Sequence, residues 1–237
     1  MGASAEERPA ISAHKGGNEH GPGERYESYL SALQAGADYV ELDVRQTADG
    51  TLIACHDDRF GRDGLTAAVG YDRLCEIAGY EICRVGRILT MISDASSVAG
   101  AHLDLKEPGC AAAAVDQALA VLRPARIIAT TSDRNVIRSL RRRYEAVPLG
   151  LSLPARARAR WRPPVELVVE SGANWAALQL RLARADVLAE CADRGIKTMV
   201  WTVNGKAALA SWLRKEHVDV LVTDQPIKAL TLRARAR

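Results

Sequence analysis

Four short groups of polar residues, each at the end of an apolar run, carry the side chains in this sequence that could do chemistry. They are His14-Lys15-Gly16, Glu41-Leu42-Asp43, His56-Asp57 and Asp104-Leu105-Lys106. If the apolar runs are neighbouring parallel strands of a barrel, the groups meet at one end of it, where functional residues of such barrels lie. Two imidazoles, two ammonium groups and the carboxylates of Glu41, Asp43 and Asp104 would then converge. This combination favours a site for a divalent metal ion and a small-molecule phosphate ester.

Glu41 and Asp43 are the strongest indication of a bound cation. Residues two apart on a strand point to the same face, and two carboxylates on an inward face are costly unless a cation or a hydrogen-bonded network compensates them. Oxygen ligands of this kind suit Mg²⁺ or Ca²⁺, with Mn²⁺ as a further candidate, and Asp104 from another strand would complete the ligand set. A plain structural alternative stays open, in which the two carboxylates face solvent or one of them pairs with Arg45.

The elements that would position these groups alternate between strand and helix. This alternation is typical of βαβ units and a parallel sheet. Nine runs are expected to form strands: 11–14, 39–44, 51–56, 101–106, 126–130, 147–153, 174–178, 197–203 and 218–223. An eight-stranded barrel needs one fewer. We assign the surplus to the runs on either side of Ala48-Asp49-Gly50, where Asp-Gly predicts a tight connection and not a helical crossover.

Amphipathic helices are expected between the strands, at 26–35, 111–122, 133–142, 185–194 and 206–214. Ser132 or Asp133 and Asn204 are candidate N-caps. The chain has 237 residues, which suits one α/β barrel, and no linker rich in Gly, Ser or Pro divides it. We therefore predict a single barrel domain at 11–231, with a flexible N-terminal tail at 1–10 and a basic C-terminal tail at 232–237.

Composition excludes several classes of protein. The net charge is +3 and aromatic residues make up 5% of the chain, which argues against a nucleic-acid-binding surface. The five cysteines have no metal-ligand spacing and are expected to be reduced thiols. The first residues lack the apolar stretch of a secretory signal, and no apolar run approaches the ~20 residues of an integral membrane segment. The expected location is cytoplasmic, and the oligomeric state is left open.

Around the polar groups at His14, Glu41, His56 and Asp104, the sequence resembles the glycerophosphodiester phosphodiesterase family. The resemblance covers almost the whole chain in the family's order, and the spacing from His14 to Glu41, Asp43 and His56 matches the family. The similar segments are 13–16, 35–44, 47–50, 56–57, 103–106, 200–204 and 222–226. The resemblance implies a TIM-type (β/α)8 barrel that cleaves a phosphodiester with the help of one divalent cation.

The resemblance also implies roles for individual residues. His14 and His56 would be the general acid and base, and which histidine has which role is left open. Glu41, Asp43 and Asp104 would hold the metal ion. The phosphate and the remainder of the substrate would contact Lys15, Lys106, Arg62 and Trp201.

Three positions depart from the family pattern. Lys15 stands where the family usually has Arg, so a point charge replaces a planar two-pronged clamp. The family's Pro-Glu-Asn-Thr stretch corresponds to Pro22-Gly23-Glu24-Arg25, which puts Gly23 at the Glu position and Glu24 one residue later. Asp104 is one methylene shorter than the family's usual Glu. In addition, the segment 57–70 has room only for a loop, where the family often carries an inserted subdomain.

Three functions remain in competition at this point. The first is hydrolysis of glycerophosphodiesters to an alcohol and glycerol phosphate. The second is a metal-dependent lyase, cyclase or transferase acting on another phosphate or diphosphate ester, motivated by the changes at Lys15 and Gly23. The third is a barrel that has lost catalysis and serves as a binding module, which the presence of both histidines and all three carboxylates disfavours.

Overall fold

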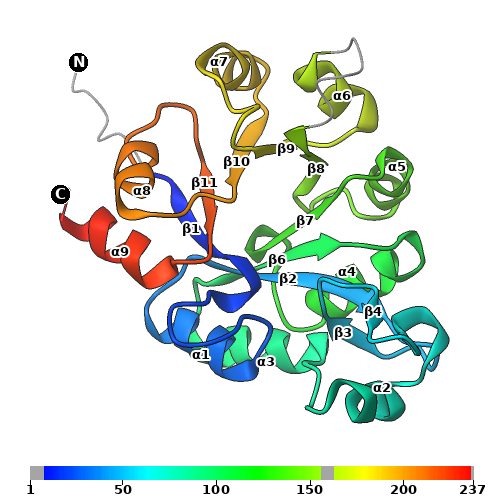
Figure 1. The fold of residues 1–237 in the computed structure, drawn as a ribbon. Helices are drawn as coiled ribbons and strands as arrows, with labels where there is room; N and C mark the ends of the chain where they lie inside the picture. Colours follow the sequence, from blue (N-terminus) through cyan, green and yellow to red (C-terminus); the bar gives the residue numbers. More distant parts are fainter. Residues whose placement is uncertain (1–7, 156–162, 236–237) are drawn as a thin grey trace.

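Eight parallel strands close into a barrel in the computed structural model, which describes residues 8–155 and 163–235 (Figure 1). Each strand pairs with the next, and β1 pairs with both β2 and β11, which closes the ring. This architecture confirms the predicted TIM-type barrel. The strands are β1 (Ala10–Ala13), β2 (Tyr39–Gln46), β6 (Gly100–Leu105), β7 (Ile127–Thr131), β8 (Leu149–Leu153), β9 (Trp175–Gln179), β10 (Lys197–Trp201) and β11 (Val220–Thr223).

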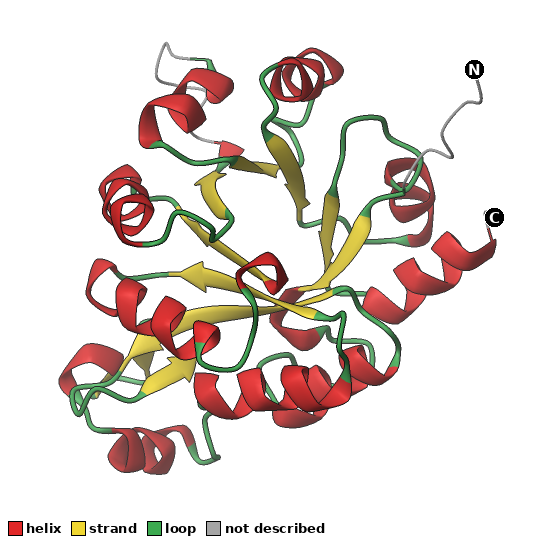
Figure 2. Cartoon of the chain, turned by 180° about the vertical axis from the view of Figure 1, so that it is seen from behind, coloured by secondary structure: helices red, strands yellow, loops and turns green. Residues whose placement is uncertain are grey.

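Helices surround the barrel on its outer side (Figure 2). Their apolar faces and the outward side chains of the strands form the main hydrophobic core. A smaller cluster lies inside the barrel, where Ile128, Ala177, Met199, Val220 and Val222 meet. The surrounding helices are α1 (Tyr26–Gln34), α3 (Val85–Ala95), α4 (Ala111–Leu119), α5 (Arg134–Arg143), α6 (Pro164–Ser171), α7 (Ala185–Asp193), α8 (Lys206–Trp212) and α9 (Pro226–Arg235).

The surplus strand is β3 (Leu52–Ala54), which pairs antiparallel with β2 across the turn at Asp49 and Gly50. The tight connection predicted there is confirmed. The prediction of a plain loop at 57–70 is wrong, because this segment forms a hairpin and a short helix that lead into a further helix. These elements are β4 (Arg59–Phe60), β5 (Gly64–Leu65), the 3₁₀ helix η2 (Thr66–Ala68) and α2 (Tyr71–Ala78).

Residues 53–82 form a small lobe beside the barrel with its own apolar cluster. Ile53, Tyr71, Leu74 and Ile82 are buried in it, and Phe60 packs against them. Tyr71 also donates a hydrogen bond to the carbonyl oxygen of Ile82 at 2.8 Å. The lobe therefore has a core of its own and is more than an irregular connection.

Helix ends follow the chemistry of the capping residues in one case and depart from it in another. The carboxylate of Asp133 accepts a hydrogen bond from the backbone N–H of Asn135 at 2.8 Å, as predicted for the start of α5. The prediction that Asn204 caps α8 is wrong. The N-cap residue is Gly205, and the side chain of Asn204 is hydrogen-bonded to Asp224 and Thr223.

The predicted domain boundaries fall close to the ends of the described chain. β1 starts at Ala10, and α9 continues to Arg235, past the predicted boundary at residue 231. Arg233 donates to Asp38 and to the carbonyl oxygen of Pro9, so the last turn of α9 contacts the start of the barrel. Residues 1–7, 156–162 and 236–237 lie outside the described residues. Among the helices that are described, none combines the length and the apolar character needed to cross a bilayer.

Asp49 joins the turn after β2 to the lobe. Its carboxylate accepts hydrogen bonds from the Thr47 hydroxyl at 2.5 Å, from the backbone N–H of Thr51 at 3.3 Å and from the backbone N–H of Tyr71 at 2.9 Å. The last of these satisfies an N–H group at the start of α2, where a negative charge is also favoured by the helix dipole. These hydrogen bonds lower the pKa of Asp49 to about 2.

We expect Asp49→Asn to be less stable than the wild type at neutral pH, with the difference in stability becoming smaller as the pH falls below about 4. A carboxyl group whose pKa is lower in the folded state stabilises the fold above its unfolded pKa, and this contribution is lost as the pH falls from about 4 to about 2. Urea unfolding midpoints of both proteins, measured between about pH 6 and pH 3, test this. A difference in midpoint that stays constant over this range would contradict the role given to the charged carboxylate.

Candidate functional site

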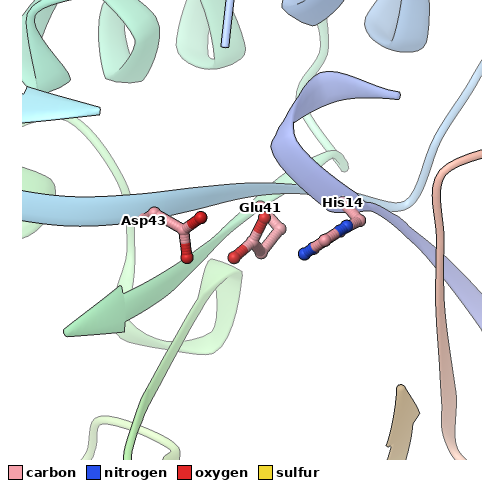
Figure 3. Close-up of side chains that lie close together, drawn as sticks. All are labelled: His14, Glu41 and Asp43. Atoms are coloured by element: carbon pink, nitrogen blue, oxygen red, sulfur yellow. The ribbon is translucent and has the colours of Figure 1, made fainter. Parts of the chain in front are cut away.

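The site lies at the ends of β1 and β6 and beside the middle of β2. Glu41 and Asp43 project from the same face of β2, and His14 follows β1, so that the three side chains lie close together (Figure 3). One potential ligand atom from each of the three residues lies within 4.8 Å of the others. Asp43 is the register partner of Asp104 on β6. The structure therefore brings together the carboxylates and the first histidine that the sequence pointed to.

The carboxylates of Glu41 and Asp43 are almost completely buried, with 2% and 1% of the residue exposed. Burial, together with the charges of Asp43 and Asp104, raises the pKa of Glu41 well above its usual range. Burial would also raise the pKa of Asp43, but Lys106, Lys15 and His56 together outweigh it and the pKa is lowered. The neighbouring positive groups thus stabilise the charged form of Asp43, but they do not offset the burial and the nearby carboxylates that act on Glu41. Buried carboxylate oxygens that repel one another are suitable ligands for a hard divalent cation.

Lys106 is the main positive charge in direct contact with the carboxylates. Its Nζ lies 2.7 Å from Asp43 Oδ1 and also contacts Asp104 Oδ2. Burial would lower the pKa of Lys106, but the two carboxylates raise it above the usual range, so the ammonium group is charged. Arg45 instead pairs with Glu107 at 2.6 Å. The alternative in which Arg45 pairs with Glu41 or Asp43 is therefore not what the structure shows.

Lys15 reaches the site through both its backbone and its side chain. Its φ and ψ are 54° and 29°, in the left-handed region that non-glycine residues seldom occupy. In this conformation its backbone N–H donates to Glu41 Oε2 at 2.6 Å, and its Nζ lies 3.6 Å from Asp43 Oδ2. The backbone turn after β1 therefore orients Glu41, while the side chain adds positive charge beside Asp43.

Gly23 and Glu24 explain one of the departures from the family pattern. A Cβ atom at Gly23 would lie 3.0 Å from both the Cβ and the carbonyl oxygen of Lys15, so a side chain there would press on this turn. Glu24 has a φ of 60° and donates its backbone N–H to the carbonyl oxygen of Lys15 at 2.9 Å. Its Oε1 accepts the backbone N–H of His56 at 2.6 Å. Glu24 thus connects the two segments that carry the histidines.

His14 is held by a carboxylate that the sequence analysis did not single out. Its Nδ1 lies 2.6 Å from Asp224 Oδ1, and the other oxygen of Asp224 accepts a hydrogen bond from the Asn204 amide. Because a carboxylate only accepts, the hydrogen on this ring lies on Nδ1, and Nε2 carries the lone pair when the ring is neutral. The hydrogen bond from His14 lowers the pKa of Asp224, so the carboxylate is charged. The signal available in the sequence was the position of Asp224 directly after β11.

His56 lies at the outer part of the site and is more exposed. Its side chain is 51% exposed, and its Nδ1 lies 2.8 Å from Asp57 Oδ1. The backbone is fixed on both sides, since the N–H donates to Glu24 and the carbonyl oxygen accepts hydrogen bonds from Arg45 at 2.9 and 3.1 Å. The position of this histidine is therefore set by backbone contacts, while its ring stays open to solvent.

A cavity of about 390 Å³ opens at this end of the barrel. The charged groups form one side of it and mostly uncharged residues of β8 to β11 form the other. Its lining residues include His14, Glu41, His56, Asp104, Lys106, His102, Thr130 and Trp201. Trp201 lies where the sequence predicted it. Arg62 is exposed in the turn between β4 and β5, and it is not part of the cavity wall that the described residues form.

His102 is a further buried histidine in this wall, and the sequence analysis did not identify it. It is the register partner of Glu41 and is 4% exposed. Burial lowers its pKa to about 4, so the ring is neutral near pH 7. Both of its nitrogens lie within hydrogen-bond distance of hydroxyl groups, those of Ser12 and Thr130.

Comparison with known proteins gives a family for this combination of fold and residues. The model of the glycerophosphoryl diester phosphodiesterase family matches residues 14–72 and 99–228. A glycerophosphodiester phosphodiesterase from Caldanaerobacter subterraneus is 21% identical over a match that covers 94% of this chain and 96% of that protein. A glycerophosphodiester phosphodiesterase from Arabidopsis thaliana is 42% identical over 50 residues, or 21% of this chain. That match spans only 13% of the Arabidopsis protein.

Solved structures share the fold over nearly the whole chain. A glycerophosphodiester phosphodiesterase from Parabacteroides distasonis has a TM-score of 0.82 and 19% identity, covering 97% of this chain and 99% of the other. A phosphodiesterase from Oleispira antarctica, solved in complex with the product sn-glycerol-3-phosphate, has a TM-score of 0.78 and 19% identity, covering 95% and 96%. The likeness extends to the whole barrel.

We expect a divalent cation to stabilise the wild type and to have no effect on Glu41→Gln, because the neutral amide removes a charged oxygen ligand. A ligand that binds only the folded state at about 100 times its Kd adds about 2.7 kcal/mol. For a chain of this length this raises the thermal midpoint by roughly 5 to 10 °C. Thermal unfolding with and without Mg²⁺, Ca²⁺ or Mn²⁺ measures this.

Glu190→Gln is a matched control, because Glu190 is a carboxylate on α7 that pairs with Arg194 at 3.0 Å, far from β2 in the chain. This variant should keep the full stabilisation by cation. Equal stabilisation of Glu41→Gln and wild type would rule out Glu41 as a ligand.

Proposed function

Because the chain belongs to the glycerophosphoryl diester phosphodiesterase family, we propose that it is a metal-dependent phosphoric diester hydrolase that cleaves glycerophosphodiesters to an alcohol and glycerol phosphate. The observation that carries this proposal is the meeting of His14, Glu41, His56, Asp104 and Lys106 in the wall of one cavity. General acid-base groups, oxygen ligands and an ammonium group are what cleavage of a phosphodiester requires.

Glu41, Asp43 and Asp104 would hold one divalent cation, Mg²⁺, Ca²⁺ or Mn²⁺. Such an ion supplies charge neutralisation at the phosphate and orientation of the attacking oxygen when it is bound. The fit rests on the buried carboxylates, since burial and the charges of Asp43 and Asp104 raise the pKa of Glu41. Lys106 and Lys15 add positive charge on the same side, and we assign them to the non-bridging oxygens of the phosphate.

His14 and His56 are assigned to proton transfer. One removes the proton from the attacking water or hydroxyl, and the other protonates the departing alkoxide. Asp224 keeps the Nδ1 hydrogen of His14 in place and would stabilise the charged imidazolium that forms when Nε2 takes up a proton. His56 has its own carboxylate neighbour in Asp57.

The rest of the cavity supports a small substrate with an uncharged portion. Trp201 and Met199 contribute apolar surface to the wall opposite the carboxylates. The Oleispira antarctica relative was solved with sn-glycerol-3-phosphate as its product, which supports glycerol phosphate as one product here. The five cysteines are free thiols, which supports a reducing compartment such as the cytoplasm for this activity.

Hydrolysis of glycerophosphocholine and glycerophosphoethanolamine, followed by the release of glycerol phosphate, tests the proposal. We expect turnover with Mg²⁺, Ca²⁺ or Mn²⁺ and none after treatment with EDTA. His14→Ala and His56→Ala should each lower kcat by about 100-fold or more, because general acid-base groups contribute this much.

The form of the failure separates the alternatives. A cyclic phosphate as the final product would point to attack by a hydroxyl of the substrate itself, as in the lyase or cyclase alternative. No turnover of any glycerophosphodiester, with cation still bound by the wild type and not by Glu41→Gln, would assign the site to a different phosphate ester.

Asp224→Asn should lower kcat by at least about 100-fold and leave KM within about threefold, because the amide can donate to Nδ1 and so favour the wrong tautomer of His14. Steady-state kinetics on the same substrates measure this. Asp133→Asn is the matched control, since Asn is as good an N-cap as Asp and α5 should be unaffected. If Asp224→Asn retains wild-type kcat, the carboxylate has no part in proton transfer.

A further inference from the structure

A row of four polar side chains runs through the barrel interior and ends at a proposed metal ligand. Ser12 Oγ lies 3.2 Å from His102 Nδ1, and His102 Nε2 lies 3.0 Å from Thr130 Oγ1. The Thr130 hydroxyl donates to Asp104 Oδ1 at 2.8 Å. Ser12, His102 and Thr130 are each at most 4% exposed, so these hydrogen bonds have little competition from bulk water.

The hydrogens in this row can be placed in only one order from Asp104 back to His102. A threonine hydroxyl has one hydrogen, and Thr130 donates it to the Asp104 carboxylate, which can only accept. Thr130 Oγ1 must therefore accept from His102 Nε2–H. In the neutral ring this leaves Nδ1 as the acceptor for the Ser12 hydroxyl. The row thus fixes one tautomer of His102 and points its hydrogens toward Asp104.

The pairing of the strands places the four side chains of the row next to one another. Asp104 and Thr130 are register partners on the neighbouring strands β6 and β7, and His102 lies two positions before Asp104 on the same face of β6. Ser12 lies on β1, two residues before His14. The row therefore connects the strand that leads to a proposed catalytic histidine with the strand that carries Asp104.

Asp104 has an orienting contact on each oxygen. Oδ1 accepts the Thr130 hydroxyl, and Oδ2 contacts the Lys106 ammonium group. Lys106 also serves Asp43, so it is shared between two carboxylates. Within the described part of the chain, Asp104 is the only carboxylate that the Thr130 hydroxyl contacts. Thr130 is in turn oriented by His102.

We propose that His102 is a positioning residue for the metal site, which acts through Thr130 to hold the Asp104 carboxylate in the orientation that binds the cation. This inference rests on the metal site of the proposed function. Hydrogen-bond partners that orient a ligand typically contribute 10- to 100-fold to metal affinity. His102 itself is not a ligand, since both of its ring nitrogens face hydroxyl groups.

Binding of Mn²⁺ alone, measured from the EPR signal of the free ion during a titration, tests this without any substrate. We expect Thr130→Val and His102→Met to weaken Mn²⁺ binding by about 10-fold or more, since each removes one link of the row and keeps most of the side-chain volume. His102→Gln, whose amide can still donate to Thr130, should restore affinity to within about threefold of the wild type.

The double variant is the sharpest part of the test. If His102 acts only through Thr130, His102→Met should cause little further loss of affinity in the Thr130→Val background, because interacting residues are not additive. Thr198→Val is the matched control. Thr198 is an equally buried threonine on β10 whose hydroxyl donates to the carbonyl oxygen of His217, and its loss should lower stability without changing Mn²⁺ affinity.

The outcomes separate this inference from the proposed function. Absence of Mn²⁺, Mg²⁺ and Ca²⁺ binding by the wild type would overturn the metal site itself. Wild-type binding together with unchanged affinity in folded Thr130→Val and His102→Met would overturn only the positioning role. Fully additive losses in the double variant would show that His102 acts independently of Thr130, which also contradicts the inference.

Discussion

The concentration of negative charge at Glu41, Asp43 and Asp104 is the constraint on which the rest of the site depends. Glu41 and Asp43 are buried and Asp104 is half-buried, and carboxylates this close together repel one another unless positive charge compensates them. Lys106 compensates Asp43 and Asp104, whereas the pKa of Glu41 remains raised by burial and by its carboxylate neighbours. A divalent cation has the charge and the ligand preference that would complete this cluster, as the proposed function requires.

The barrel produces this cluster through strand register and backbone conformation. Parallel pairing places Asp43 opposite Asp104, and the alternation of side chains puts Glu41 on the same face two residues earlier. The turn after β1 then adds a backbone N–H from Lys15 to Glu41, which requires a left-handed residue at that position. Side chains from distant parts of the sequence hold the surroundings in place, as Asp224 does for His14 over a separation of 210 residues.

The sequence was sufficient for the barrel and for the residues that end its strands, because both depend on local patterns and fixed spacing. It was not sufficient for contacts between distant segments. Asp224 directly follows β11 and His102 lies in the middle of β6, and only the closed barrel shows that one holds His14 and the other faces Thr130. The lobe at residues 53–82 was missed because its strands are two residues long and its core is separate from the barrel. Arg62 was predicted from its match to a basic position of the family, and it is not among the described residues that line the cavity.

The shift of a glutamate from position 23 to position 24 shows why geometry is a better guide to this site than motif letters. The space beside Lys15 leaves no room for a side chain at Gly23 without displacement of the turn that orients Glu41. A left-handed backbone at Glu24 keeps a carboxylate in the neighbourhood, where it accepts the backbone N–H of His56. The chain therefore combines a glycine at position 23 with a carboxylate at position 24 that is joined to the histidine segment. In this chain a glycine at position 23 and a glutamate at position 24 are therefore compatible with the backbone contacts that hold Lys15 and His56.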